Sequence, residues 1–280
     1  MKLAQKLAVN YYRAKFNLLA LVSKERAAKA AFKLFSTPVQ RSKKKWPPVF
    51  SKAERLHFLL GNKTIRGYRF NRGGVKKVLI LHGFESSVRN FDQDIKPLLK
   101  KNYEVLAFDA PGHGDSDGKR IILPMYMETL AAIYHKYGPI DSYMAHSFGG
   151  IAVMHFLESI ATTTDTRVAL IAPLTETTTA INTFFSFLQI NNEVRPAFEN
   201  IITGIRGQPP SYYSIPRALK QVHATILWVH DKQDDITPYK DMEPLLQQAP
   251  PQVEFMITEG LGHRRIYREN KVVKAIVDFL

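Results

Sequence analysis

Short apolar runs alternate with segments of helical periodicity over most of this chain. A strand buried on both faces of a parallel sheet reads as a continuous apolar run, because neither of its faces meets water. Such runs occupy residues 77–82, 103–109, 140–145, 167–173, 225–230 and 253–258, and helical segments occupy 90–101, 124–137, 148–160, 240–248 and 265–280. The alternation predicts an α/β fold with a mostly parallel central sheet flanked by helices.

Two segments depart from this alternation. Residues 65–70 alternate apolar and polar side chains and predict an antiparallel or edge strand, with a turn at 71–74. Residues 174–220 carry aromatic and branched side chains at helical spacing and predict a short helical lid inserted between two strands of the sheet. The Phe-rich part of this insertion, 184–198, would form either the core of the lid or an acyl-binding pocket.

The first 50 residues are strongly basic. They hold 12 lysines and arginines against one acid, so +11 of the chain's net charge of +14 lies there. Apolar residues recur in this segment at helical spacing, at Leu3, Leu7, Tyr11, Ala14, Leu18 and Leu21. We therefore predict a basic helical arm and a Pro-broken charged linker over residues 1–50, followed by one α/β domain over residues 51–280.

Two interpretations of this arm stay open. Its apolar stripe docks on its own domain while the lysines stay in water, or residues 1–45 make a peripheral contact with an anionic membrane surface. We expect no nucleic-acid partner, because the basic run has no interleaved aromatic residues and no recognisable nucleic-acid module. The pattern predicts no signal peptide and no membrane-spanning helix, hence a cytoplasmic protein with membrane association as the alternative. The sequence does not predict an oligomeric state.

The composition narrows the chemistry that the chain can carry out. The chain has no cysteine, which excludes disulfides, thiolate catalysis and cysteine-ligated metals. Neither a metal-spaced cluster of His, Asp and Glu nor a Gly-rich phosphate loop is recognisable, so we expect no metal and no cofactor. Ser147 instead stands between a predicted strand and a predicted helix, with the small residues Ala145 and Gly149 two positions away on either side. A sharp strand-to-helix turn of this kind exposes a serine hydroxyl as a nucleophile.

Such a serine needs a general base, and His263 is the best-placed histidine. An unassisted hydroxyl is a poor nucleophile at neutral pH. His263 lies in a Gly-rich loop just after the strand predicted at 253–258, at the carboxyl edge where open α/β sheets bind ligands. By contrast, His135 and His155 lie within predicted helices, and His57 precedes the predicted sheet.

The acid that orients this histidine is expected in the loop after the strand predicted at 225–230. The candidates are Asp231, Asp234 and Asp235. With any of them, the chain order is serine, then aspartate, then histidine, which is the order of the α/β-hydrolase arrangement.

Four stretches in the required order resemble the α/β-hydrolase-fold superfamily over roughly residues 60–280. They are His82-Gly83-Phe84, residues 109–116, residues 145–149 with Ala145 where the family has glycine, and His230 to Pro238 together with Gly262-His263. The resemblance implies the α/β-hydrolase fold, and it assigns the acid to Asp234, with Asp235 as the alternative. It also implies an oxyanion hole formed by the backbone N–H groups of Phe84 and Phe148.

The loops of these motifs hold other polar residues for which we expect structural roles. Asp109 should tie down the loop that follows it, and Glu85 and Arg89 should take part in local ion pairs. The histidines expected to shape turns are His82, His113 and His230.

The resulting prediction is a serine hydrolase that cleaves a carboxylic ester of a small or lipid-like acyl substrate through an acyl-enzyme. Ser147 would attack, His263 would move the proton and Asp234 would orient His263. Thioester or amide cleavage and acyl transfer stay open, because the same triad serves all of them. A non-catalytic binding module and a membrane-peripheral acyltransferase or thioesterase are the competing predictions.

Overall fold

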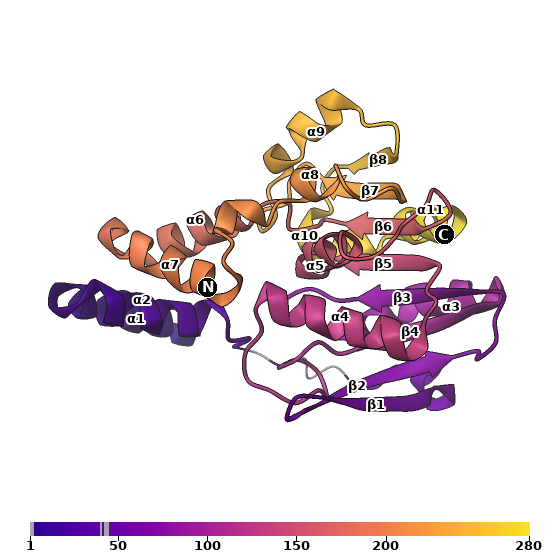
Figure 1. The fold of residues 1–280 in the computed structure, drawn as a ribbon, viewed down its shortest axis with the longest axis horizontal. Helices are drawn as coiled ribbons and strands as arrows, with labels where there is room; N and C mark the ends of the chain where they lie inside the picture. The colour runs from indigo at the N-terminus through magenta and orange to yellow at the C-terminus, as the bar shows by residue number, and fades with distance from the viewer. Residues whose placement is uncertain (1–2, 40, 42–44) are drawn as a thin grey trace. The chain divides into compact units, whose positions relative to one another are not determined.

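The computed structural model describes residues 3–39, 41 and 45–280, so Lys2 of the predicted arm and residues 42–44 of the predicted linker lie outside the described residues (Figure 1). The chain divides into two compact units. We call Pro38–Thr175 with Ile215–Leu280 the sheet unit, and Met1–Thr37 with Glu176–Ser214 the helical unit. The N-terminal arm and the insertion therefore belong to one unit, although about 140 residues separate them in the sequence.

An eight-stranded sheet organises the sheet unit, in the order β1-β2-β4-β3-β5-β6-β7-β8 (Figure 1). The strands are β1 (Glu54–Leu60), β2 (Lys63–Phe70), β3 (Lys76–Leu81), β4 (Tyr103–Phe108), β5 (Ser142–His146), β6 (Arg167–Ile171), β7 (Thr225–Asp231) and β8 (Val253–Thr258). β1 and β2 are antiparallel to their neighbours, and β3 to β8 run parallel. The predicted α/β fold with a mostly parallel sheet is confirmed.

The first two strands agree only in part with the prediction. β1 was not predicted, and His57 lies within it rather than before the sheet. β2 is antiparallel to β1 and β4, as one of the two predicted alternatives had it, but it is not an edge strand, because it pairs on both sides. As the edge strand, β1 buries only Leu56 and Phe58 among its seven residues, too few to give a continuous apolar run.

Helices cover both faces of this sheet (Figure 1). One face packs against the helices α3 (Asp92–Lys100) and α11 (Asn270–Phe279), whose apolar residues share a core cluster with side chains of β3 to β7. α4 (Leu123–Tyr137) and α5 (Phe148–Leu157) pack against each other on the other face. The short helices of the sheet unit are α8 (Ile215–Ala218), α9 (Glu243–Gln248) and α10 (Gly262–Arg265).

The predicted helix over 265–280 is interrupted. α10 continues into a 3-10 turn over Ile266–Arg268, and α11 begins only at Asn270. Glu269 has extended backbone angles, with φ −73° and ψ 126°, which end the turn before α11 starts.

Four helices form the helical unit, namely α1 (Leu3–Val22), α2 (Lys24–Phe35), α6 (Thr177–Leu188) and α7 (Arg195–Arg206). Their shared core centres on Phe198, which is fully buried and lies within 6.1 Å, ring centre to ring centre, of Phe32, Phe35, Phe184 and Phe185. The arm thus supplies half of the helices that bury the aromatic residues of the insertion.

The arm itself is two helices, and its predicted stripe does not dock. Ser23 separates α1 from α2, because its backbone is extended and its Oγ accepts a hydrogen bond from the N–H of Arg26 as a helix N-cap.

The six stripe residues Leu3, Leu7, Tyr11, Ala14, Leu18 and Leu21 are all exposed. α1 instead packs by another face, through Val9, Tyr12, Phe16, Leu19 and Ala20. The first interpretation of the arm, in which that stripe docks on its own domain, is therefore wrong. Across the described part of the chain, no helix is long and apolar enough to span a bilayer.

Candidate active site

Ser147 occupies a strained turn between β5 and α5. Its backbone angles are φ 56° and ψ −121°, a region that residues other than glycine rarely adopt. Three hydrogen bonds hold the turn. The Ser147 N–H donates to the Ile171 carbonyl at 3.1 Å, and the Ser147 carbonyl accepts from the N–H groups of Gly150 at 2.9 Å and Leu174 at 3.0 Å. The sequence around the serine therefore forms the predicted sharp turn.

Two glycines let neighbouring backbone approach this turn. A Cβ atom on Gly83 would lie 2.7 Å from the Ser147 Cβ, and one on Gly149 would lie 2.9 Å from the His82 carbonyl oxygen. Such distances leave no room for a methyl group on either residue. The loop after β3 thus runs directly beside Ser147.

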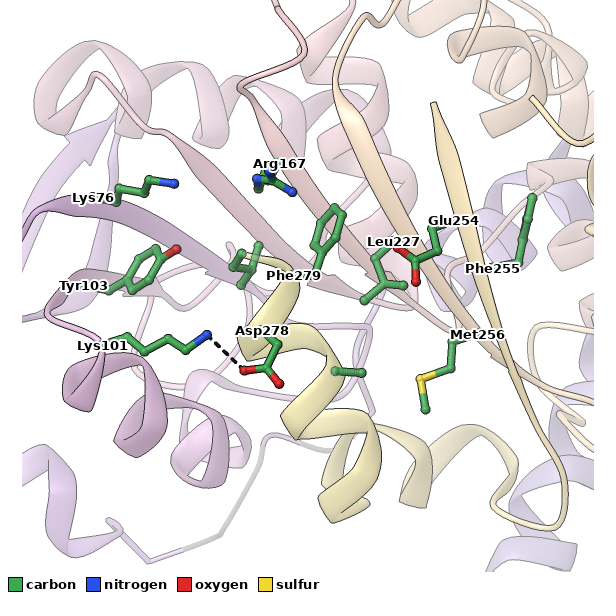
Figure 2. Close-up of a pocket in the computed structure, with 12 residues that line it drawn as sticks. Lys76, Lys101, Tyr103, Arg167, Leu227, Glu254, Phe255, Met256, Asp278 and Phe279 are labelled. Carbon is green, nitrogen blue, oxygen red and sulfur yellow. Dashed lines mark hydrogen bonds and ion pairs between the residues drawn. The ribbon is translucent and has the colours of Figure 1, made fainter. Parts of the chain in front are cut away.

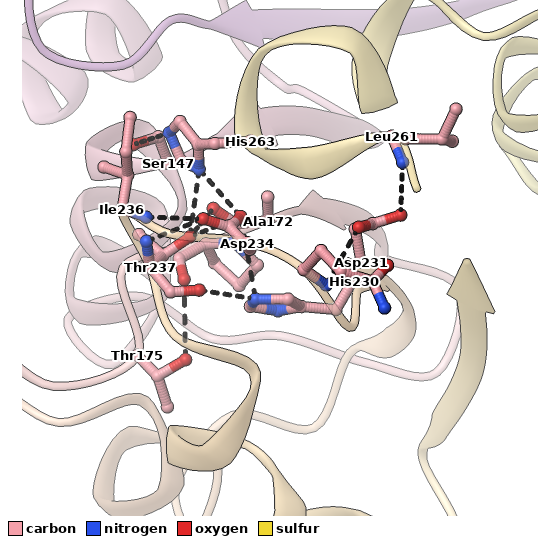
Figure 3. Close-up of polar contacts among 12 residues, drawn as sticks. Ser147, Ala172, Thr175, His230, Asp231, Asp234, Ile236, Thr237, Leu261 and His263 are labelled. Atoms are coloured by element: carbon pink, nitrogen blue, oxygen red, sulfur yellow. Dashed lines mark hydrogen bonds and ion pairs between the residues drawn. The ribbon is translucent and has the colours of Figure 1, made fainter. Parts of the chain in front are cut away.

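The structure brings Ser147, His263 and Asp234 together in a hydrogen-bonded row (Figure 3). The Ser147 Oγ lies 3.0 Å from Nε2 of His263, and Nδ1 of the same ring lies 2.8 Å from Oδ2 of Asp234. All three side chains are buried or nearly so, with 8%, 6% and 6% of each residue exposed. The row has the connectivity of a Ser-His-Asp triad.

Asp234, and not Asp235, supplies the carboxylate of this row. Asp234 also accepts hydrogen bonds from the N–H groups of Ile236 at 2.9 Å and Thr237 at 2.8 Å. Burial raises the pKa of Asp234, but the hydrogen bonds from His263 and from these two N–H groups outweigh it, so the pKa lies below its ordinary value. Asp234 is therefore ionised at neutral pH, whereas Asp235 is exposed to solvent.

Comparisons with known proteins find similarity to other proteins of this fold. Residues 75–200 match the family described as serine aminopeptidase, S33. An esterase of Pyrococcus furiosus superposes with a TM-score of 0.63 at 18% identity, over 88% of this chain and 97% of the esterase. A monoacylglycerol lipase of Paleococcus ferrophilus gives 0.59 at 20% identity, over 76% and 97%, and α/β hydrolase domain-containing protein 10 of mouse gives 0.59 at 14%, over 81% and 96%. No curated protein matches the chain by sequence.

The chain has the α/β-hydrolase fold. Its sheet, its turn at Ser147 and its order of motifs are those that the resemblance implied.

Thr237 also contacts the hydrogen-bonded row, although no role was predicted for it. Its Oγ1 lies 2.9 Å from Oδ2 of Asp234, 3.0 Å from Nδ1 of His263 and 3.1 Å from the carbonyl oxygen of Ala172 (Figure 3). The hydroxyl thus links the carboxylate and the imidazole to the end of β6. Its place in the sequence, three residues after Asp234 and just before Pro238, was the available signal.

His82 and His113 hold the loops beside Ser147 as neutral rings. The N–H of Ala110 donates to Nε2 of His82 at 3.0 Å, and the N–H of Glu85 donates to Nε2 of His113 at 3.1 Å. Each ring therefore has its proton on Nδ1, which donates to a backbone carbonyl. Burial lowers the pKa of His82 to about 4 and, with the nearby His82, lowers that of His113 to about 3. The expected structural role for both rings agrees with these contacts.

His230 and Asp231 connect the two loops that carry the acid and the base. Nδ1 of His230 accepts from the indole N–H of Trp228 at 3.2 Å, so Nε2 donates to the Thr237 carbonyl at 2.8 Å. Burial lowers the pKa of His230, which keeps it neutral. Asp231 accepts from the N–H of Leu261 at 3.0 Å and thereby ties the end of β7 to the loop before His263 (Figure 3).

His146 contacts both the backbone and the ring of His263. Its Nε2–H donates to the His263 carbonyl oxygen at 3.1 Å, and its ring centre lies 4.7 Å from that of His263 and 4.6 Å from that of Tyr267. Burial and the neighbouring His263 lower the pKa of His146 to about 3, so the ring stays neutral. No local sequence pattern indicated this contact, which joins residues 117 positions apart.

Asp109 and Arg89 have the local roles expected of them, whereas Glu85 has a different partner. The Asp109 carboxylate accepts from the N–H groups of Val88 and Asp115, both at 3.0 Å, and so fixes the loop after β4. Arg89 forms an ion pair with Asp115, and its guanidinium lies 3.7 Å from the ring centre of Trp46. Glu85 accepts a hydrogen bond from the backbone N–H of Val39.

A separate cavity of about 800 Å³ opens at the opposite edge of the sheet (Figure 2). It lies beside Lys76, Tyr103 and Arg167, the first residues of β3, β4 and β6, whereas Ser147 follows the last residue of β5. Within it, Lys101 pairs with Asp278 at 3.0 Å. The cavity therefore does not contain the hydrogen-bonded row. Among the described residues, no group of three or more His, Asp or Glu could hold a metal ion.

Proposed function

We propose that this α/β-hydrolase is a serine hydrolase that cleaves carboxylic esters of small or lipid-like acyl substrates. The row from Ser147 through His263 to Asp234 carries the proposal, because it joins a hydroxyl held in a strained turn to a base and an ionised acid. The likeness to an esterase and to a monoacylglycerol lipase supports an ester as the substrate.

In the proposed reaction, the Ser147 Oγ attacks the carbonyl carbon of the ester while Nε2 of His263 takes the hydroxyl proton. The ester C–O bond breaks, His263 gives this proton to the departing alkoxide, and an acyl-enzyme and an alcohol result. A water then attacks the acyl-enzyme with His263 again as the base, and this step releases the carboxylic acid and restores Ser147. Asp234 holds the ring with Nδ1 protonated and stabilises the imidazolium.

We further propose that the backbone N–H groups of Phe84 and Phe148 bind the oxyanion. Phe148 opens α5, where N–H groups have no partner within the helix. Phe84 follows Gly83, whose close approach to Ser147 supports a place beside the same carbonyl oxygen. The loss of one such donor typically costs about 10²–10³ in kcat.

Apolar side chains near Ser147 support an apolar acyl group. Phe84 and Ile236 are 37% and 40% exposed, although each adjoins a residue or loop of the proposed site. The Phe84 ring packs edge-on against Phe148, and the ring centre of Tyr126 lies 5.7 Å from that of Phe148. Exposed apolar surface of this kind suits an acyl chain, because binding the chain removes both surfaces from water.

A panel of p-nitrophenyl esters of increasing acyl length, with a fluorophosphonate probe, tests the proposal. We expect hydrolysis and a covalent probe adduct in the wild type, and neither in Ser147→Ala. We expect Asp234→Asn to lower kcat by about 10⁴ through the wrong histidine tautomer, as such a change does in a serine protease triad.

Matched variants act as controls. Ser159→Ala, Asp235→Asn and His223→Gln change exposed residues of the same three types and should retain wild-type kcat. A folded wild type that takes no probe and hydrolyses no ester would contradict the proposal and favour a binding module. If the protein hydrolyses an acyl thioester but no ester, the proposed substrate class is wrong, whereas the proposed triad stands.

A further inference from the structure

α1 presents a continuous apolar stripe to solvent. Among the described residues, 14 large apolar side chains are exposed, and six of them lie on this one helix. They are Leu3, Leu7, Tyr11, Leu18, Leu21 and Val22, with 59% to 83% of each residue exposed. At about 100° per residue they span only about 100° of the helix circumference. Exposed apolar side chains gathered in this way indicate a binding surface.

This stripe is not a remnant of the core of the helical unit. The residues by which α1 packs, Tyr12, Phe16 and Leu19 among them, lie on the opposite side of the helix. The packed side is held further by Arg13 and Asn17, which donate to the carbonyl oxygens of Phe187 at 2.7 Å and Gln189 at 3.0 Å. α1 is thus fixed on α6 by one face and leaves the stripe uncovered.

Positive charge borders the stripe. Lys6 and Lys15 are both exposed and flank it on its two sides, and the Lys15 ammonium lies 5.6 Å from the ring centre of Tyr11. α1 contains no acid, and Glu25 is the one acid among the first 50 residues. A second copy of this surface would place like charges face to face, which disfavours self-association.

We propose that α1 binds an anionic lipid surface, with its apolar stripe in the boundary between headgroups and acyl chains. Lys6 and Lys15 would lie at the level of the anionic headgroups. Apolar burial and charge attraction then act on the same helix face. This inference goes beyond the proposed hydrolase function and does not depend on the reactivity of Ser147.

Vesicle sedimentation of the 280-residue chain tests the proposal. We expect binding to vesicles of equimolar phosphatidylcholine and phosphatidylserine, weak binding to phosphatidylcholine alone, and partial release by high salt because salt screens the lysines. Equal binding to both kinds of vesicle, or none to either, would overturn it.

A variant with acidic residues in the stripe gives the decisive test of lipid binding. Leu7→Glu combined with Leu18→Glu should lower the partition coefficient for anionic vesicles more than tenfold, because it removes apolar contact and adds repulsion. Leu59→Glu, at a leucine 73% exposed on β1, is the matched control and should bind as the wild type does. Unchanged binding of the double variant refutes the proposal.

Two further measurements separate the alternatives. If α1 served a second copy, light scattering would find a wild-type dimer that the double variant dissociates, with no vesicle binding. Hydrolysis of a short soluble ester should be unchanged in the double variant, and Ser147→Ala should still bind vesicles. Failure of the hydrolase proposal would thus leave the lipid result intact, and the reverse also holds.

Discussion

Ser147 reaches its position because small residues surround it on several sides. The positive φ of the turn is stabilised by hydrogen bonds to β6 and α5, and the loop after β3 passes so close that only glycine fits at position 83. The geometry of the hydroxyl is therefore set by backbone packing rather than by the serine side chain itself.

Gly83→Ala should lower the kcat of ester hydrolysis about 10²-fold while leaving the protein folded. The added methyl would lie 2.7 Å from the Ser147 Cβ, so the turn or the loop with Phe84 must shift. A displacement of about 1 Å at such a site typically costs about 10²-fold in kcat. Gly204→Ala is the control, because a Cβ there, in α7, meets nothing within 4 Å. Its kcat should equal that of the wild type, and equal kcat in both variants would rule out the steric argument.

Sequence patterns predicted the members of the row but not the contacts that hold it. Ser147, Asp234 and His263 follow the parallel strands β5, β7 and β8, and parallel strands bring their carboxyl ends to one edge. The preference for Asp234 over Asp235 came from the resemblance to the α/β-hydrolase superfamily, and Oδ2 of Asp234 lies 2.8 Å from Nδ1 of His263. No contact of Thr237 or His146 with the row was predicted, because these contacts depend on how three loops meet in space.

At the scale of elements, the arm and the insertion stabilise each other. α2 and α7 meet through Phe32, Phe35 and Phe198, and three small buried residues of α2, namely Ala27, Ala28 and Ala31, allow their backbones to approach. Lys24 also pairs with Glu193 at 2.8 Å. Neither segment alone has enough apolar surface to form such a core.

Phe198→Ala should unfold the helical unit selectively. Removal of a fully buried phenylalanine ring costs about 3–5 kcal/mol. Both tryptophans, Trp46 and Trp228, belong to the sheet unit, so their fluorescence reports on that unit, whereas circular dichroism at 222 nm reports on all helices. The variant should lose part of its helical signal at a lower temperature than the one at which tryptophan emission changes.

Phe187→Ala is the matched control for this measurement. Phe187 lies on α6 of the same unit but is 50% exposed, so its truncation should shift neither signal by more than a degree or two. If the two signals of Phe198→Ala shift together by the same amount, the helical unit does not unfold by itself.

The elements that were predicted poorly from the sequence are those that are only partly buried or that carry apolar residues on more than one face. Strands β3 to β7 are buried on both faces and produce unambiguous apolar runs. β1 is half exposed, and α1 carries apolar residues on two opposite faces, so periodicity alone cannot say which face packs. The choice depends on the insertion, which lies far away in the sequence.

At the scale of the whole molecule, buried neutral histidines make stability depend on pH. His82, His113 and His146 are at most 5% exposed, and burial lowers their pKa values to about 4, 3 and 3. In the unfolded chain each would take up a proton below about pH 6.5. The unfolded state therefore binds more protons between about pH 6.5 and 4, and the free energy of unfolding falls as the pH falls through this range. Burial raises the pKa of Asp109, which offsets part of this loss.

His113→Gln tests this account, because glutamine takes up no proton. In the wild type, each of the three histidines should contribute a loss of about 1–2 kcal/mol between pH 7 and pH 5. We expect the difference in unfolding free energy between these two pH values to shrink by that amount in His113→Gln, whatever the variant's stability at pH 7. Urea unfolding followed by tryptophan fluorescence measures this difference in the sheet unit, which holds both tryptophans. His223→Gln, at an exposed histidine, should keep the wild-type difference. If His113→Gln also keeps it, the ring at position 113 is already protonated in the folded protein at pH 5, and the loop beside Ser147 is more accessible to water than its burial indicates.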